Sequence, residues 1–135
     1  MTESRQGSLL VLRILSALIL LAIAGIHLFL IFDGVGGLLG VMFVLNGIAG
    51  VVLAVAILIT RGALLRIVAI LSLLFVLASL AAILLALTVG LFGITEVWSF
   101  TLVPETVIVE AIGVVVLAIT CGAVFRRGRA VGATA

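Results

Sequence analysis

Four long apolar runs divide this sequence and restrict its fold more than any other feature. They cover about residues 9–32, 41–60, 64–89 and 103–125, while 67% of all residues are hydrophobic and 9% are charged. About 20 consecutive apolar residues are enough for a helix to cross the hydrocarbon core of a bilayer. None of the four runs has the polar face that a helix of a soluble protein needs. We therefore predict a single domain, residues 1–135, that is an all-α integral membrane four-helix bundle with up-down-up-down topology.

The charged residues differ in sign between the two ends of the predicted bundle. With four spans, the two termini and the link at 60–63 share one side of the membrane, and the other two loops share the opposite side. The first side holds every basic residue and the second holds three acids: Arg5, Arg13, Arg61, Arg66, Arg126, Arg127 and Arg129 against Asp33, Glu96 and Glu105. Cytoplasmic loops carry the excess of Arg and Lys in membrane proteins. We predict that both termini are cytoplasmic. The net charge of +2 is too small to indicate nucleic-acid binding, although the pI is about 10.1.

Three strongly polar residues interrupt the apolar runs at a similar depth. His27, Asn46 and Glu110 each lie about six residues from the outer end of a predicted span, which is roughly 9 Å of helix. An ionisable side chain is expensive in lipid and is therefore a candidate for a functional site. We expect these three groups to converge in one polar layer. Thr88, near the end of the third span, could join its rim.

Two residues of the long outer loop complete the candidate site. Glu96 and Trp98 lie in the segment 90–104, directly outside the expected polar layer. The candidate site for a ligand or a proton is thus His27, Asn46, Glu110, Glu96 and Trp98.

Two interpretations of the polar layer remain open. Interhelical hydrogen bonds in membranes contribute about 0.6–2 kcal/mol, so the layer could be a clasp that only fixes helix register. In that case the protein is an accessory or structural component. The alternative is a small-molecule, quinone or proton binding site coupled to transport or redox chemistry, in which His27 and Glu110 share a proton and Asn46 orients them. A cavity beneath Glu96 and Trp98 would favour binding, and tight packing there would favour the clasp.

The sequence offers little for catalysis or for a metal. Metal sites usually need three or four His, Cys or carboxylate ligands, and one chain supplies only His27, Glu110 and Glu96, with Cys121 as its single cysteine. Neither a Gly-rich phosphate loop nor a Ser-His-Asp set is present. We predict no catalytic residues and no metal, regard an enzyme as the less favoured class, and identify no cofactor. The expected partners are the lipid bilayer and either a second copy of the chain or another membrane protein.

Small residues predict where the helices pack. Ala78, Ala82, Ala86 and Gly90 recur every four residues in the third span, and Gly50 precedes Ala54 by four in the second. Such residues let helix backbones approach closely in a membrane. We therefore expect both rows to form contacts within the bundle.

Several short motifs resemble those of a known group of membrane proteins. They are His27-Leu28-Phe29-Leu30, Met42-Phe43-Val44-Leu45-Asn46, Gly90-Leu91-Phe92-Gly93, the pair Glu96 and Trp98, and Glu110. Together they resemble small four-span membrane proteins of high-GC Gram-positive bacteria, to which no activity is assigned. The use of Arg without any Lys agrees with high-GC coding. The resemblance implies the four-span architecture and a bacterial cytoplasmic (inner) membrane, and it supplies no mechanism.

Overall fold

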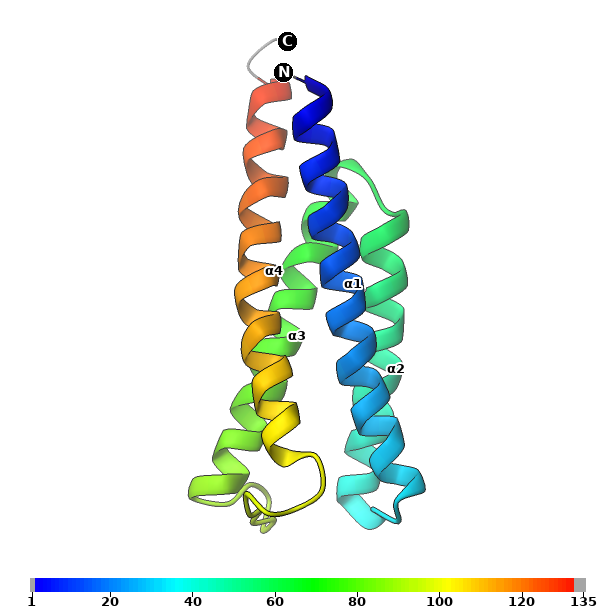
Figure 1. Cartoon of the computed structure of the whole chain (residues 1–135), viewed down its shortest axis with the longest axis vertical. Coiled ribbons are helices and arrows are strands. Elements are labelled where there is room, and N and C mark those ends of the chain that lie inside the picture. Colours follow the sequence, from blue (N-terminus) through cyan, green and yellow to red (C-terminus); the bar gives the residue numbers. More distant parts are fainter. Residues whose placement is uncertain (1, 133–135) are drawn as a thin grey trace.

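Four antiparallel helices make up almost all of the described chain (Figure 1). The computed structural model describes residues 2–132 and the side-chain surroundings of residues 7–127. The helices are α1 (Thr2–Phe32), α2 (Gly37–Ile59), α3 (Gly62–Thr88) and α4 (Val103–Gly132). Short links join α1 to α2 and α2 to α3, and a longer loop joins α3 to α4. The first turn of α1 and the last turn of α4 lie at the same end of the bundle. The prediction of an all-α four-helix membrane bundle is confirmed.

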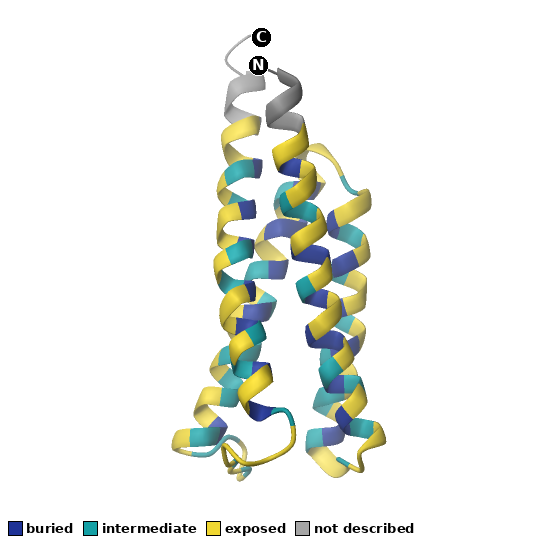
Figure 2. Cartoon of the chain, viewed as in Figure 1, coloured by how far each residue is buried: buried dark blue, intermediate teal, exposed yellow. Residues whose placement is uncertain are grey.

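The outer surface of the bundle is apolar. Figure 2 shows exposed residues along the outward faces of all four helices, and large aliphatic side chains such as Leu18, Val52 and Ile112 are among them. Each helix contains a segment long and apolar enough to cross a membrane. A surface of this kind is stable when it faces lipid rather than water.

The helices do not contact one another equally. α1 packs against both α2 and α4, and α3 packs mainly against α4, whereas α2 and α3 have the fewest contacts among these neighbouring pairs. The core is centred on side chains with no exposed surface, including Leu20, Ile57, Val76 and Leu117. The molecule is therefore two hairpins joined chiefly through α1 and α4.

Glycine makes the α1–α2 contact close. A Cβ atom at Gly50 would lie 3.0 Å from both the Ala24 Cβ and the Leu20 carbonyl oxygen, and one at Gly47 would lie 2.6 Å from the Leu28 side chain. The predicted contact along Gly50 and Ala54 is observed, since both residues are buried.

Arg13 links the same two helices near the end where the termini lie. Its Nε donates a hydrogen bond to the Ile57 carbonyl oxygen (2.8 Å), and its Nη2 donates to those of Leu58 (2.6 Å) and Thr60 (2.9 Å). The last carbonyl groups of a helix have no partner within the helix. Arg13 therefore caps α2, a role that its position among the basic residues did not reveal.

The charges separate by end as the sequence predicts. Arg61 follows α2, and Arg126 and Arg127 lie in the last turns of α4, all at the end that holds the termini (Figure 1). Asp33 and Glu105 lie at the opposite end. The side chains of Arg5 and Arg129 lie outside the described residues.

Candidate ligand-binding site

A pocket of about 440 Å³ lies between the two hairpins, at the end away from the termini. All four helices contribute to its wall, and the segment between α3 and α4 contributes Ile94, Glu96 and Phe100. Its volume falls within the range of about 300–1,000 Å³ that is usual for small-molecule sites. Most of the lining side chains are apolar.

Small side chains on α3 make room for this pocket. Ala78, Ala82 and Ala86 all line it. Gly90 lies beyond the end of α3, with a positive φ of 83° in the following turn. The prediction that this row forms contacts within the bundle stays a prediction, and the structure adds that three of its four residues line the pocket.

A chain of hydrogen bonds crosses one wall of the pocket. The Asn46 amide Nδ2 on α2 donates to Ser79 Oγ on α3 (2.9 Å), and Ser79 Oγ donates to Glu110 Oε1 on α4 (2.5 Å). Three helices are thus connected through one hydroxyl group.

Ser79 was absent from the predicted layer, and Thr88 does not join it. The Thr88 hydroxyl bonds to the Leu84 carbonyl oxygen of its own helix (2.7 Å), and its side chain is exposed. Ser79 lies about nine residues from the end of α3, and Asn46 lies about nine residues from the start of α2, roughly 13 Å of helix in each case. The second helix begins at Gly37 and not near Val41, so Asn46 lies deeper in its helix than the sequence suggested and at the same distance from the helix end as Ser79.

Glu110 is the most deeply buried member of the site. It is 0% exposed, and its Oε2 atom has no hydrogen-bond partner; the Oδ1 atom of Asn46 is likewise buried and unpaired. A buried polar atom without a partner usually costs about 1–3 kcal/mol. The wall therefore presents two acceptors that the protein itself leaves unsatisfied.

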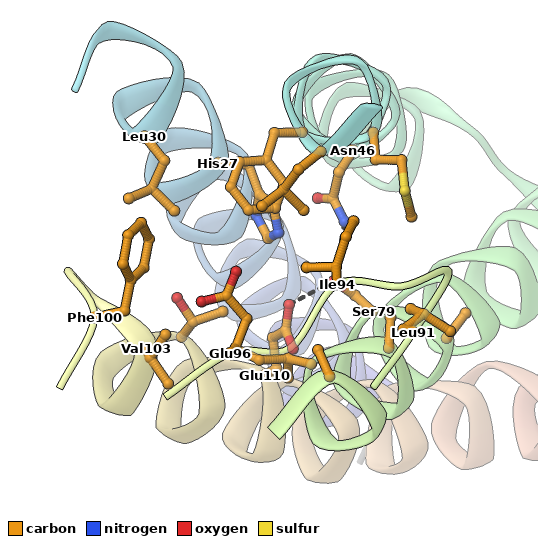
Figure 3. A pocket seen from close by; sticks show the side chains of 18 of the residues that line it. His27, Leu30, Asn46, Ser79, Leu91, Ile94, Glu96, Phe100, Val103 and Glu110 are labelled. Carbon is orange, nitrogen blue, oxygen red and sulfur yellow. Dashed lines mark hydrogen bonds between the residues drawn. The ribbon is translucent and has the colours of Figure 1, made fainter. Parts of the chain in front are cut away.

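His27 faces the same pocket but forms no hydrogen bond with Glu96 or Glu110. Its Nδ1 lies 2.8 Å from the Ile23 carbonyl oxygen, and its ring meets the Phe43 ring edge-on at 5.0 Å. A carbonyl oxygen only accepts, so Nδ1 carries the proton, and a neutral ring then offers Nε2 as an acceptor. Figure 3 shows the side chains of His27, Glu96 and Glu110 pointing toward one another from α1, the outer loop and α4.

A tight turn brings Glu96 over the pocket. Leu91 and Ile94 exchange two backbone hydrogen bonds of 2.8 Å, and the residues between them, Phe92 and Gly93, have positive φ values of 50° and 78°. Both central residues of a type I′ turn have positive φ. The Glu96 N–H then donates to the Ala86 carbonyl oxygen (3.0 Å), which holds the loop against α3.

Glu96 and Trp98 differ in their relation to the pocket. Partial burial raises the pKa of the Glu96 carboxyl above its ordinary value, because water no longer fully solvates the charge. Trp98 is 57% exposed and is not among the residues that line the pocket. Its position outside the spans suits the interfacial region, where Trp is enriched in membrane proteins.

The fold and this site define a small multi-pass membrane protein that contains a partly polar pocket. No protein-family model, curated protein or solved structure matches the chain. Among the residues with described side chains, no three His, Cys, Asp or Glu groups lie close enough together to hold a metal ion. The functional argument therefore depends on the pocket and its acceptors.

Proposed function

We propose that this protein binds a small, mostly apolar molecule between its two hairpins, in the cytoplasmic membrane of a bacterium. One observation carries the proposal: a pocket of about 440 Å³ has the buried Glu110 carboxyl at its wall, and one oxygen of that carboxyl has no partner. A concave apolar site with a few convergent polar groups is the usual form of a ligand site. The charge distribution supports an orientation in which this pocket lies in the outer half of the membrane.

The incomplete hydrogen bonding supports a binding site over a purely structural clasp. A clasp is most stable when every buried donor and acceptor is paired, since a partly satisfied buried network is worse than an apolar one. Here Asn46 and Glu110 each retain an unpaired acceptor. A bound molecule would satisfy these acceptors, and water would satisfy them in the ligand-free protein.

The clasp is nevertheless the second candidate, because one specific observation favours it. The Asn46–Ser79–Glu110 chain joins α2, α3 and α4, and α2 and α3 have few other contacts. As a clasp alone, the chain would hold the hairpins together in an accessory protein without a ligand.

Native purification with a filled-pocket variant separates the two candidates. The protein would be extracted directly into lipid nanodiscs, and its small molecules would be identified by mass spectrometry. Ala82 lines the pocket, whereas the neighbouring Ala81 is exposed on the outer surface. We expect a compound that co-purifies with the wild type and with Ala81→Phe and is lost from Ala82→Phe. If the three proteins carry the same molecules, the clasp is the better account.

A further inference from the structure

We infer that the pocket takes a membrane-soluble amine in its ammonium form, with its N–H groups donated to Glu110 and Asn46. This inference depends on the proposed function, since it assigns the ligand class of the same site. It follows from the hydrogen-bonding character of the polar wall, from its charge and from the shape of the remaining surface.

The buried polar atoms of the wall that have no partner are both acceptors. Glu110 Oε2 and Asn46 Oδ1 are buried and unpaired. The Nδ1–H of His27 is used by the Ile23 carbonyl oxygen, which leaves Nε2 as an acceptor in the neutral ring. The amide of Asn46 and the hydroxyl of Ser79 already donate along the chain toward Glu110. An occupant that satisfies this wall must supply donors.

The charge of the wall is negative. Glu96 and Glu110 both line the pocket, and none of its described lining residues is Arg. The described Arg side chains lie toward the opposite end of the bundle, and no described His or Arg forms an ion pair with either acid. A buried carboxylate is stable only when it is paired with positive charge or strong donors. An ammonium group supplies both.

The same features argue against other ligand classes. A carboxylate or phosphate would meet two acids without a cation between them. A quinone offers only carbonyl acceptors and would leave Glu110 Oε2 and Asn46 Oδ1 without a hydrogen-bond donor. Beyond the polar wall, Leu30, Phe75, Ala82 and Ile83 line the pocket with apolar surface, which fits an alkyl or aryl chain. The chemistry therefore selects a cationic head with N–H donors and an apolar tail.

Binding of four C8 amphiphiles, identical in chain length, tests this assignment. The protein would be placed in nanodiscs of zwitterionic phosphatidylcholine, and equilibrium dialysis near neutral pH would measure binding above that of empty nanodiscs. The probes are n-octylamine, n-octyltrimethylammonium, n-octanol and n-octanoate. We expect saturable binding of octylamine, with the other three about tenfold weaker or more, because each lacks the charge, the N–H donors or both.

Substitution of single acids locates the binding. Glu110→Gln should weaken octylamine binding by about tenfold or more, since it removes the charged acceptor. Glu105→Gln is the matched control: it removes the same charge from an exposed position on the same helix, outside the pocket, and should leave binding unchanged. If Glu110→Gln does not fold, the loop variant Glu96→Gln serves in its place and should weaken octylamine binding a few-fold.

The outcomes distinguish failure of the inference from failure of the proposed function. If octanol or octanoate binds as tightly as octylamine, or if both Glu110→Gln and Glu96→Gln bind octylamine like the wild type, the ammonium assignment is wrong while a binding pocket remains. Saturable binding of octyltrimethylammonium equal to octylamine overturns the role of the N–H donors. If none of the four probes binds saturably and no compound co-purifies with the protein, both the inference and the proposed function are overturned.

Discussion

One hydroxyl group holds the polar wall of this protein together. Ser79 accepts a hydrogen bond from Asn46 and donates one to Glu110, so it is the only direct link that the structure shows between those two side chains among the described residues. Ser72 lies two turns earlier on α3 with its Oγ also buried, but that oxygen has no partner. The two serines therefore form a natural pair of test positions.

We predict that Ser79→Ala lowers the free energy of unfolding by about 1–2 kcal/mol, because it removes two interhelical bonds and leaves buried groups unpaired. Denaturation in mixed detergent micelles, followed by circular dichroism, would measure the change. Ser72→Ala should have no effect or should stabilise, since it removes an unpaired hydroxyl. Equal losses at both positions would show that the Ser79 bonds contribute nothing beyond packing.

A second prediction at this scale concerns pH. Burial raises the pKa of Glu96 above 4.5, so its carboxyl gains a proton at a higher pH than an exposed glutamate does. His27 from α1 and Glu110 from α4 face Glu96 across the pocket, while α2 and α3 contribute the neutral Asn46 and Ser79. Protonation removes a negative charge from the site. Octylamine affinity should therefore fall as the pH is lowered toward the raised pKa of Glu96, and by less in Glu96→Gln. Identical pH profiles for the two proteins would exclude this role for Glu96.

At the scale of helices, the α1–α2 contact depends on glycine. We predict that Gly50→Ala lowers the free energy of unfolding by roughly 1–3 kcal/mol, because its Cβ would press on Ala24 and on the backbone at Leu20. Gly25→Ala is the control on α1: its Cβ would meet nothing within 4 Å, so the better helix propensity of alanine should stabilise by up to about 1 kcal/mol. Detergent unfolding of both variants would measure the contrast. If the Gly50→Ala protein is as stable as the Gly25→Ala protein, the α1–α2 contact accommodates the extra methyl group without loss of stability.

The cap at the end of α2 gives a further prediction. Arg13→Met should lower the free energy of unfolding by about 1–3 kcal/mol, because three carbonyl groups lose a charged donor. Arg66→Met removes the same charge from the same end of the bundle, at a half-buried side chain for which the structure shows no hydrogen bond, and should cost less. Arg13→Lys should fall between them, since it keeps the charge but not the planar set of donors. If Arg66→Met destabilises as much as Arg13→Met, the loss of stability comes from removing a positive charge at this end of the bundle and not from removing the cap.

At the scale of the whole molecule, we predict that the termini and the α2–α3 link face the cytoplasm, because the Arg residues lie on that side. Single cysteines at Gly36, between α1 and α2, and at Ala63, at the start of α3, would be placed in a Cys121→Ala background. A membrane-impermeant maleimide added to intact cells should label the first position only. Labelling at Ala63 would invert the topology and place the pocket in the inner half of the membrane.

The sequence predicted the architecture well and the site only in part, for different physical reasons. Long apolar runs with short links leave almost no alternative to a helical hairpin, so the fold followed from length and hydropathy. His27, Asn46 and Glu110 were recognisable because polar groups are costly in lipid. Ser79 was not, since a serine can bond to its own helix and carries no such cost. The alanine row was ambiguous, because a missing side chain permits either close helix contact or an empty space, and only the position of α2 decides between them.

The hydrogen bonds of Arg13 also help to hold the two helices of the first hairpin in their alignment along their length. About 14 residues, or roughly 21 Å of helix, separate Arg13 from His27 on α1, and about the same length separates Thr60 from Asn46 on α2. A slip of α1 by one turn would move His27 by about 5.4 Å and carry it away from the level of Asn46. The guanidinium group at one end of the hairpin thus opposes any slip that would change the relative height of two pocket residues at the other end. Arg13 belongs to the architecture of the site although it lies far from it.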